Sequence, residues 1–243
     1  MGRPYTSTKR REDIRVRVAN PEHAYPACVV LGCSQPTMAK QRSGLNKNYC
    51  RRHVEHFRRH GSYSKKSYTA AQLSAYRRSA LAWLQARRAC AEVEEAVERV
   101  RLLYWRAGQP EEAFRLAGKA PEERSRYVWA GLREAGVDPL VVLASAIAVR
   151  LCLQADPQPE RRQEFAHVQM GKLLQRMAGG SHKRWEHQRP DGSIEVTALH
   201  KYPVSRGRVL RHVGLWAEHA IKPLSLDSLR DACDETLRDG RQP

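Results

Sequence analysis

Four potential metal ligands within 26 residues constrain the fold of this chain more than any other feature. Cys28 and Cys33 are separated by four residues, and Cys50 and His53 are separated by two. Zinc takes four nitrogen or sulfur ligands in a tetrahedron, and one pair on a tight turn with a second pair on the first turn of a helix supplies them readily. Because the protein fills all four positions, the sequence predicts a structural Zn²⁺ and not a catalytic one.

The residues around these ligands favour the two local structures that such a site needs. In "CVVLGC", Gly32 stands directly before the second cysteine, where the chain must turn tightly. Asn48 is expected to cap a helix over residues 49–60, in which Cys50 and His53 lie one turn apart on the same face.

Two further histidines are alternatives to His53 as the fourth ligand. His56 and His60 follow one and two turns later on the predicted helix. The geometry favours His53, because it is the histidine one turn from Cys50, and it leaves the other two open.

The same helix carries arginines on the side away from the predicted metal. At 100° per residue, Arg51, Arg52, Arg58 and Arg59 gather on one face, with Glu55 alone between them. A basic helix face suits the phosphates of a nucleic acid. The alternative is a solvated charged face without a partner, which is common on helices.

The charge of the chain is concentrated at its N-terminal end. Lys and Arg number 43 against 26 Asp and Glu, which gives a net charge of +17. Residues 1–68 hold 15 of the basic residues and 4 of the acidic ones. This excess indicates a polyanionic partner. The predicted nucleic-acid contacts outside the helix are Arg10, Arg11, Lys65 and Lys66, with Arg184 and Arg208 in a second basic region formed by a hairpin and the helix after it.

The cysteine region resembles a known zinc-binding segment. The run "C-x4-C-S-Q-P … G-L-N-K-N-Y-C-R-R-H-V-E-H-F-R-R-H-G-S" is similar to a short segment of many bacteriophage and mobile-element proteins, often placed before HNH-type homing endonucleases. In that family two cysteines, a later cysteine and a histidine hold zinc, and an arginine-rich helix ends in a glycine. The matching positions are Cys28, Cys33, Cys50, His53 and Gly61. The resemblance covers 35 of the 243 residues, and it implies nucleic-acid association for this segment alone.

The rest of the chain has mainly helical patterns. Neither Pro nor Gly occurs from Ala70 to Ala107, and Thr69 is a suitable N-cap, so one long helix is predicted there. Its apolar stripe shifts at Arg87 and Arg88, where a bend or a change of packing partner is expected. Further helices are predicted over residues 110–118, 121–136, 139–155 and 158–178, of which 139–155 is apolar nearly all round and should be the centre of a bundle.

The last part of the chain has a different pattern. A Pro-Asp-Gly turn separates two runs with strand character, which predicts a β-hairpin over residues 182–202, before helices over 205–220 and 224–238. The predicted fold class is therefore mainly α: an N-terminal treble-clef-like zinc module, then a helical bundle with one β-hairpin near the C-terminus. The predicted divisions are a basic arm at 1–20 with a short strand at 14–18, the zinc module at 21–68, a bundle with a long first helix at 69–180, and the hairpin with C-terminal helices at 181–243.

These features together predict a zinc-containing, DNA-binding accessory or regulatory protein of a phage or integrated mobile element. We expect duplex DNA as its partner, a second copy or a recombinase-type protein on the helical body, and a cytoplasmic location at the nucleoid. The alternatives are an RNA or single-strand binder and a protein-interaction scaffold with structural zinc. A nuclease is disfavoured because Asn48 is the last asparagine, so no standard HNH unit can follow the zinc helix, and no enzymatic activity is predicted. No apolar run approaches the ~20 residues that cross a bilayer.

Overall fold

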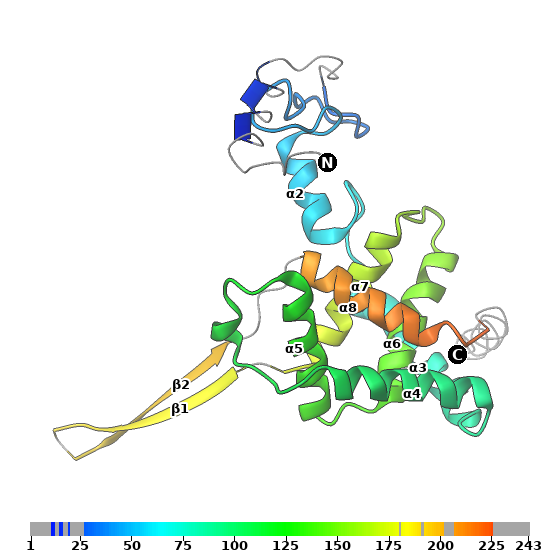
Figure 1. Cartoon of the computed structure of the whole chain (residues 1–243), viewed down its shortest axis with the longest axis vertical. Helices are drawn as coiled ribbons and strands as arrows, with labels where there is room; N and C mark the ends of the chain where they lie inside the picture. The colour runs from blue at the N-terminus through cyan, green and yellow to red at the C-terminus, as the bar shows by residue number, and fades with distance from the viewer. Residues whose placement is uncertain are drawn as a thin grey trace, which may run out of the picture. The chain divides into compact units, whose positions relative to one another are not determined.

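The computed structural model describes residues 11–12, 15–16, 19, 27–179, 181–190, 192–201 and 207–225, with the backbone alone at 113–114, 181–184 and 198–201. It is mainly helical and has one antiparallel β-hairpin near the C-terminus, which confirms the predicted fold class (Figure 1). The elements are α2 (Arg51–His60), α3 (Ala70–Ala86), α4 (Ala91–Arg106), the 3-10 helix η1 (Ala113–Leu116), α5 (Pro121–Glu134), α6 (Pro139–Ala155), α7 (Gln163–Met177), β1 (Ser181–Gln188), β2 (Ile194–Lys201) and α8 (Gly207–Ile221). The chain divides into two compact units, residues 1–66 and 67–243.

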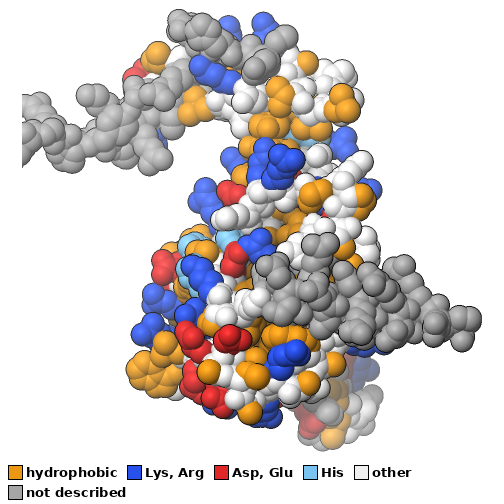
Figure 2. All heavy atoms as spheres, turned by 90° about the vertical axis from the view of Figure 1, so that its right-hand side faces the viewer, with side chains coloured by type: hydrophobic (Ala, Val, Ile, Leu, Met, Phe, Trp, Pro, Cys, Tyr) orange, Lys and Arg blue, Asp and Glu red, His pale blue; other side chains and the backbone are white. Residues whose placement is uncertain are grey.

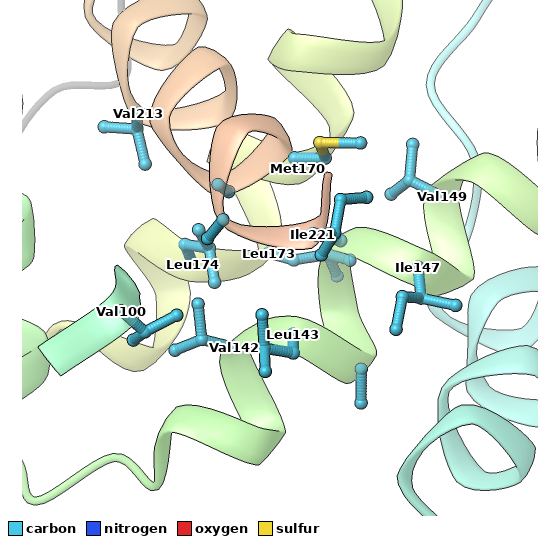
Figure 3. Close-up of a cluster of buried hydrophobic side chains, with 14 of the residues drawn as sticks. Val100, Val142, Leu143, Ile147, Val149, Met170, Leu173, Leu174, Val213 and Ile221 are labelled. Carbon is cyan, nitrogen blue, oxygen red and sulfur yellow. The ribbon is translucent and has the colours of Figure 1, made fainter. Parts of the chain in front are cut away.

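Helix α6 is the centre of the second unit, as predicted. Its N-cap is Asp138, whose side chain accepts a hydrogen bond from the backbone N–H of Leu140 at 2.7 Å. Twelve of its residues are buried, because α3, α4, α7 and α8 all pack against it. Figure 3 shows Leu143 of α6, Leu174 of α7 and Ile221 of α8 pointing toward one another in this core. Burial on every side explains why the helix reads as apolar nearly all round.

The predicted helix over residues 70–107 is not continuous, because the chain forms two helices, α3 and α4, with a turn at residues 87–90. The bend or change of packing partner expected at Arg87 and Arg88 is confirmed. At 100° per residue, an unbroken helix would place Val93 half a turn away from Leu84. Both side chains are nevertheless fully buried. The turn allows this, since α3 packs against α6 while α4 packs against α5, α6 and α8.

The start of α3 is fixed by a capping box, as its N-cap Thr69 suggested. The Thr69 side chain accepts from the backbone N–H of Gln72 at 3.2 Å, and the Gln72 side chain accepts from the backbone N–H of Thr69 at 2.8 Å. We expect Thr69→Ala to lower the free energy of unfolding by about 1 kcal/mol, measured by urea denaturation. Ser74→Ala, inside α3, is the control and should change it by less than about 0.5 kcal/mol. Equal effects of the two substitutions would contradict the role of the cap.

Other predicted boundaries need smaller corrections. The segment 110–118 forms only the four-residue helix η1, because the stretch between Pro110 and Gly118 is too short to stabilise an α-helix. Helix α7 begins at residue 163 and not at 158, because two prolines within 157–159 disfavour helical backbone there. Helix α5 ends at Glu134, and Gly136 follows with φ 63° in the left-handed region, as its position predicted.

The N-terminal arm differs from its prediction at the described positions. Residues 11–12, 15–16 and 19 have helical backbone, so the short strand expected at 14–18 is wrong at Arg15 and Val16. The Arg15 guanidinium lies 4.0 Å from the carboxylate of Glu12, one turn earlier. The strand was predicted only from the alternation of apolar and charged residues in "IRVRV". This alternation covers only five residues, which is too short a pattern to distinguish a strand from a helix.

The predicted β-hairpin is present, with Trp185 opposite Thr197 and Gln188 opposite Ile194. Figure 1 shows β1 and β2 extending away from the helices of their unit. The described side chains of residues 185–190 and 192–197 are all exposed. The helix predicted over 205–220 is α8, although residues 205 and 206 and most of the helix predicted over 224–238 lie outside the described residues.

Helices α7 and α8 make the closest approach in this unit. Gly214 of α8 meets the backbone of His167, and Gly171 of α7 meets the backbone of Leu210. A side chain at either glycine would occupy the space that the other helix fills. In the part of the chain that the structure describes, no helix has the length and apolar character needed to cross a membrane.

Candidate metal centre and basic helix face

The first ligand pair lies on a tight turn. The backbone N–H of Cys33 donates to the carbonyl of Val30 at 2.9 Å, and Gly32 between them has φ 78°. This left-handed conformation is easily adopted only by glycine, so Gly32 has the role that the sequence predicted. The turn brings the two cysteines of the Cys-x4-Cys run to the same side of the chain.

The second pair lies at the start of α2. Cys50 is the N-cap residue, and His53 is one turn into the helix. The predicted cap Asn48 is wrong by two residues, since the Asn46 side chain accepts from the backbone N–H groups of residues 48 and 49 and turns the chain before α2 begins. A hydrogen bond from the backbone N–H of Val29 to the carbonyl of Asn48, at 2.9 Å, joins the turn to the helix start.

These two local structures bring all four predicted ligands together. The ligand atoms of Cys28, Cys33, Cys50 and His53 lie within 4.8 Å of one another. His53 Nδ1 is 3.2 Å from Sγ of Cys28 and 3.4 Å from Sγ of Cys50, and the sulfurs of Cys33 and Cys50 are 4.0 Å apart. The sulfurs are too far apart for disulfides, and the cysteines are free. The cluster could therefore hold one metal ion.

The electrostatic surroundings favour the metal-binding forms of two of these groups. Burial opposes ionisation of the Cys28 thiol, but hydrogen bonds from the backbone N–H groups of Cys50 and Val30 outweigh it and lower its pKa. Burial and then the charge of Arg52 lower the pKa of His53, so its imidazole is neutral near pH 7. Burial and the neighbouring Cys28 raise the pKa of Cys50, whose proton must leave when a metal binds.

The structure separates His53 from its two alternatives. His56 Nδ1 donates to the carbonyl oxygen of Ser62 at 2.8 Å, and its ring lies 4.4 Å from the ring of His60. Neither His56 nor His60 belongs to the group of ligand atoms. His53 is the histidine that faces the cysteines.

The arginines of α2 lie where the helical pattern places them. Arg51, Arg52, Arg58 and Arg59 are all exposed, whereas Val54 on the other side of α2 is buried. Arg51 pairs with Glu55 at 3.1 Å. Figure 2 shows Lys and Arg side chains spread over the face in view, with Asp and Glu side chains gathered in one part of it.

The structure describes the other predicted contact residues only in part. Arg10 lies outside the described residues, Arg11 and Lys66 are exposed, and Lys65 is partly buried. Arg208 is exposed near the start of α8, in the helical unit. Arg184 lies on β1 opposite residue 198, and its side chain is not described. Their roles stay predictions.

A stack of three aromatic rings supports α2, and sequence analysis missed it. The rings of Tyr49 and Tyr63 are parallel at 3.5 Å, and Phe57 stacks on Tyr63 at 4.6 Å. Gly61 makes this possible, because its φ of 75° ends the helix and turns the chain back along it. The sequence showed that Gly61 ends the arginine-rich helix. It did not show that this glycine places the ring of Tyr63 against Tyr49 and Phe57.

A largely buried polar cluster, in which His167 is buried and Arg150 and Glu218 are partly exposed, was also missed in the helical unit. Glu218 of α8 contacts both Arg150 of α6 and His167 of α7. Burial and then the charge of Arg150 lower the pKa of His167 to about 4, so the imidazole is neutral near pH 7. The two contacts of Glu218, with Arg150 and with His167, join α6, α7 and α8. Because His167 and Glu218 are 51 residues apart, no local pattern could reveal the contact.

Comparison of the chain with protein-family models, with curated proteins and with solved structures finds no match.

Proposed function

We propose that the N-terminal unit is a structural zinc module that binds nucleic acid, with duplex DNA as its first ligand. The protein would act as an accessory or regulatory factor of a phage or integrated mobile element. One observation carries this proposal: α2 has the metal ligands at its start and on one face, and four exposed arginines on the opposite face. The assignment to a mobile element rests on the resemblance of the cysteine segment.

The distances between the ligand atoms support zinc. Bonds of about 2.3 Å to sulfur and about 2.0 Å to nitrogen, arranged in a tetrahedron, separate two sulfurs by about 3.8 Å and a sulfur from a nitrogen by about 3.5 Å. The corresponding distances are 4.0 Å between Cys33 and Cys50, and 3.2 and 3.4 Å from His53 to Cys28 and Cys50. Three thiolates and one imidazole fill every position of such a site, which suits a structural ion.

The exposed face of α2 supports nucleic-acid binding. Arginine guanidinium groups match phosphate oxygens in a two-pronged geometry, and an α-helix fits the major groove of duplex DNA. Among the described residues, only Arg51 of the four arginines has an ion-pair partner, Glu55. Both side chains of that pair are largely exposed, so it is weak and Arg51 can still contact a phosphate. The net charge of +17 adds long-range attraction.

The test is fluorescence anisotropy of the zinc-loaded full chain with duplex DNA, single-stranded DNA and RNA of matched sequence, each at several salt concentrations. Replacing Arg51, Arg52, Arg58 and Arg59 together by Gln should reduce the slope of log affinity against log salt by up to about 4, because up to four phosphate contacts are lost. Zinc content should not change, since none of the four is a ligand.

A matched variant separates this helix face from the charge of the whole chain. Arg77, Arg78, Arg87 and Arg88 are exposed residues in and after α3, and replacing them by Gln removes the same charge from the other unit. This variant should keep the wild-type slope. Equal effects of the two variants would contradict binding through α2. Preference for RNA or single strands would favour the alternative ligands, and no binding at low salt would favour a protein partner for the basic surface.

A further inference from the structure

A cleft of about 590 Å³ lies between α4, α5 and α8 in the helical unit. Helix α4 lines it with Leu103 and Arg106, α8 lines it with Trp216 and His219, and α5 lines it with Trp129; Ala107 follows the end of α4. Two small residues, Ala107 and Ala220, are among those that line the cleft. Its volume is within the ~300–1,000 Å³ of small-molecule sites.

The base of the cleft is apolar. Trp129 is fully buried, and Ala107 and Ala220 are almost so. Leu102 at the cleft is 42% exposed. Covering an exposed leucine side chain lowers the free energy, because apolar surface is removed from water. A ligand with an apolar body would remove this surface from water.

The charged residues of the cleft all have the same sign. Arg99 is held in place, since it donates to the backbone carbonyl of His219 at 2.8 Å and to the Glu95 carboxylate at 2.7 Å. Arg106 is exposed and has no hydrogen bond or ion pair among the described residues. Burial and then the positive charges of Lys222 and Arg99 lower the pKa of His219, as expected in a positive field. Among the described residues, no acidic side chain lines the cleft.

A second cleft in the same unit provides the contrast. It has a volume of about 320 Å³ and lies on another side of α4, lined by Arg88 and Arg101 together with Glu94, Glu98 and Asp138. Its arginines therefore have carboxylates of the protein beside them. In the larger cleft Arg99 and Arg126 likewise pair with Glu95 and Glu122, but Arg106 has no ion-pair partner among the described residues. Arg106 is therefore the arginine that a ligand carboxylate can pair with.

We propose that the cleft between α4, α5 and α8 binds an amphipathic organic anion, with an apolar body against Leu103, Ala107 and Trp216 and one carboxylate at Arg106. This site goes beyond the proposed nucleic-acid function and does not depend on it, because no residue of the N-terminal unit lines the cleft. The DNA-binding test and the ligand test can thus succeed or fail separately.

The experiment is isothermal titration calorimetry of the full zinc-loaded chain with three probes. Naphthoate has both an aromatic body and a carboxylate, naphthalenemethanol has the same body without charge, and acetate has the charge without the body. Naphthoate should bind with one site per chain and at least tenfold more tightly than either of the other probes. Naphthalenemethanol binding as tightly as naphthoate, or the absence of a saturable naphthoate site, would overturn the proposal.

Substitutions locate the site. Arg106→Gln should weaken naphthoate binding about tenfold, because a charge-assisted hydrogen bond is lost. Arg101→Gln is the matched control, since it removes the same charge from the same helix outside the cleft, and should leave affinity unchanged. Leu102→Glu places a like charge at an exposed position beside the bound carboxylate and should also cost at least tenfold. Equal affinities of the Arg106 and Arg101 variants, with unchanged circular dichroism, would refute the assignment.

Discussion

Under the proposed zinc assignment, Cys50→Ser is expected to abolish zinc binding and to unfold residues 28–62. The Cys50 sulfur is 3.4 Å from His53 Nδ1 and 4.0 Å from the Cys33 sulfur, so the substitution removes one of the four predicted ligands. Structural zinc contributes on the order of 10 kcal/mol to the folding of small modules. No regular secondary structure is present there to replace it before α2, since residues 27–50 form turns and loops without a helix or β-strand. Metal content per chain and hydrogen exchange of residues 28–62 measure the two effects.

Two controls distinguish the metal site from general effects of substitution. Cys90→Ser changes an exposed cysteine at the N-cap of α4, outside the cluster, and should keep one zinc per chain. His53→Ala should lose zinc, whereas His56→Ala should keep it and lose only the hydrogen bond to Ser62, worth about 1 kcal/mol. A Cys50→Ser chain with full zinc content would mean that the cluster is not the metal site.

The metal cluster could be predicted because its information is local. All four ligands lie within 26 residues, and each pair is positioned by its own short structure, the turn at Gly32 and the first turn of α2. The arginine face followed from the same helical period. The sequence did not decide which of His53, His56 and His60 is the fourth ligand. In the structure the His56 ring is hydrogen-bonded to the carbonyl oxygen of Ser62 and faces away from the cysteines.

The break between α3 and α4 shows a different limit. The absence of Gly and Pro from residues 70–107 predicted one helix, because these residues are the usual signals that end one. The shift of the apolar stripe at Arg87 and Arg88 was visible, and a strict application of the 100° period to Leu84 and Val93 would have favoured two helices. Burial against different partners outweighed local helix propensity at this point.

The cleft and the buried polar cluster could not be predicted from the sequence. Arg99 and His219 are 120 residues apart, and Arg150 meets Glu218 only because α6 and α8 pack together. In the sequence, the arginines of α4 look like an ordinary charged surface. Only the packing of the neighbouring helices shows that, among the described residues, Arg106 has no ion-pair partner. Such sites depend on tertiary packing, which spacing along one helix does not encode.

Gly214→Ala is expected to destabilise the helical unit, although alanine normally stabilises a helix interior by about 1 kcal/mol relative to glycine. A Cβ atom on Gly214 would lie 2.0 Å from the backbone oxygen of His167 and 2.5 Å from its carbonyl carbon. A backbone atom cannot rotate away, so α7 and α8 must separate, and their buried side chains lose contacts. We expect the free energy of unfolding to fall by about 2 kcal/mol or more, measured by urea denaturation with unchanged zinc content.

A second glycine and an exposed alanine make this prediction specific to the helix contact. Gly171→Ala should act in the same direction, since its Cβ would lie 2.4 Å from the backbone oxygen of Leu210. The double variant should lose less than the sum of the two, because helices already separated by one methyl group accommodate the other. Ala82→Gly, at an exposed position of α3, should show the ordinary preference by losing about 1 kcal/mol. A Gly214→Ala chain at least as stable as the wild type would show that α7 and α8 do not meet at this glycine. Without their close approach, alanine should make the helix more stable than glycine does.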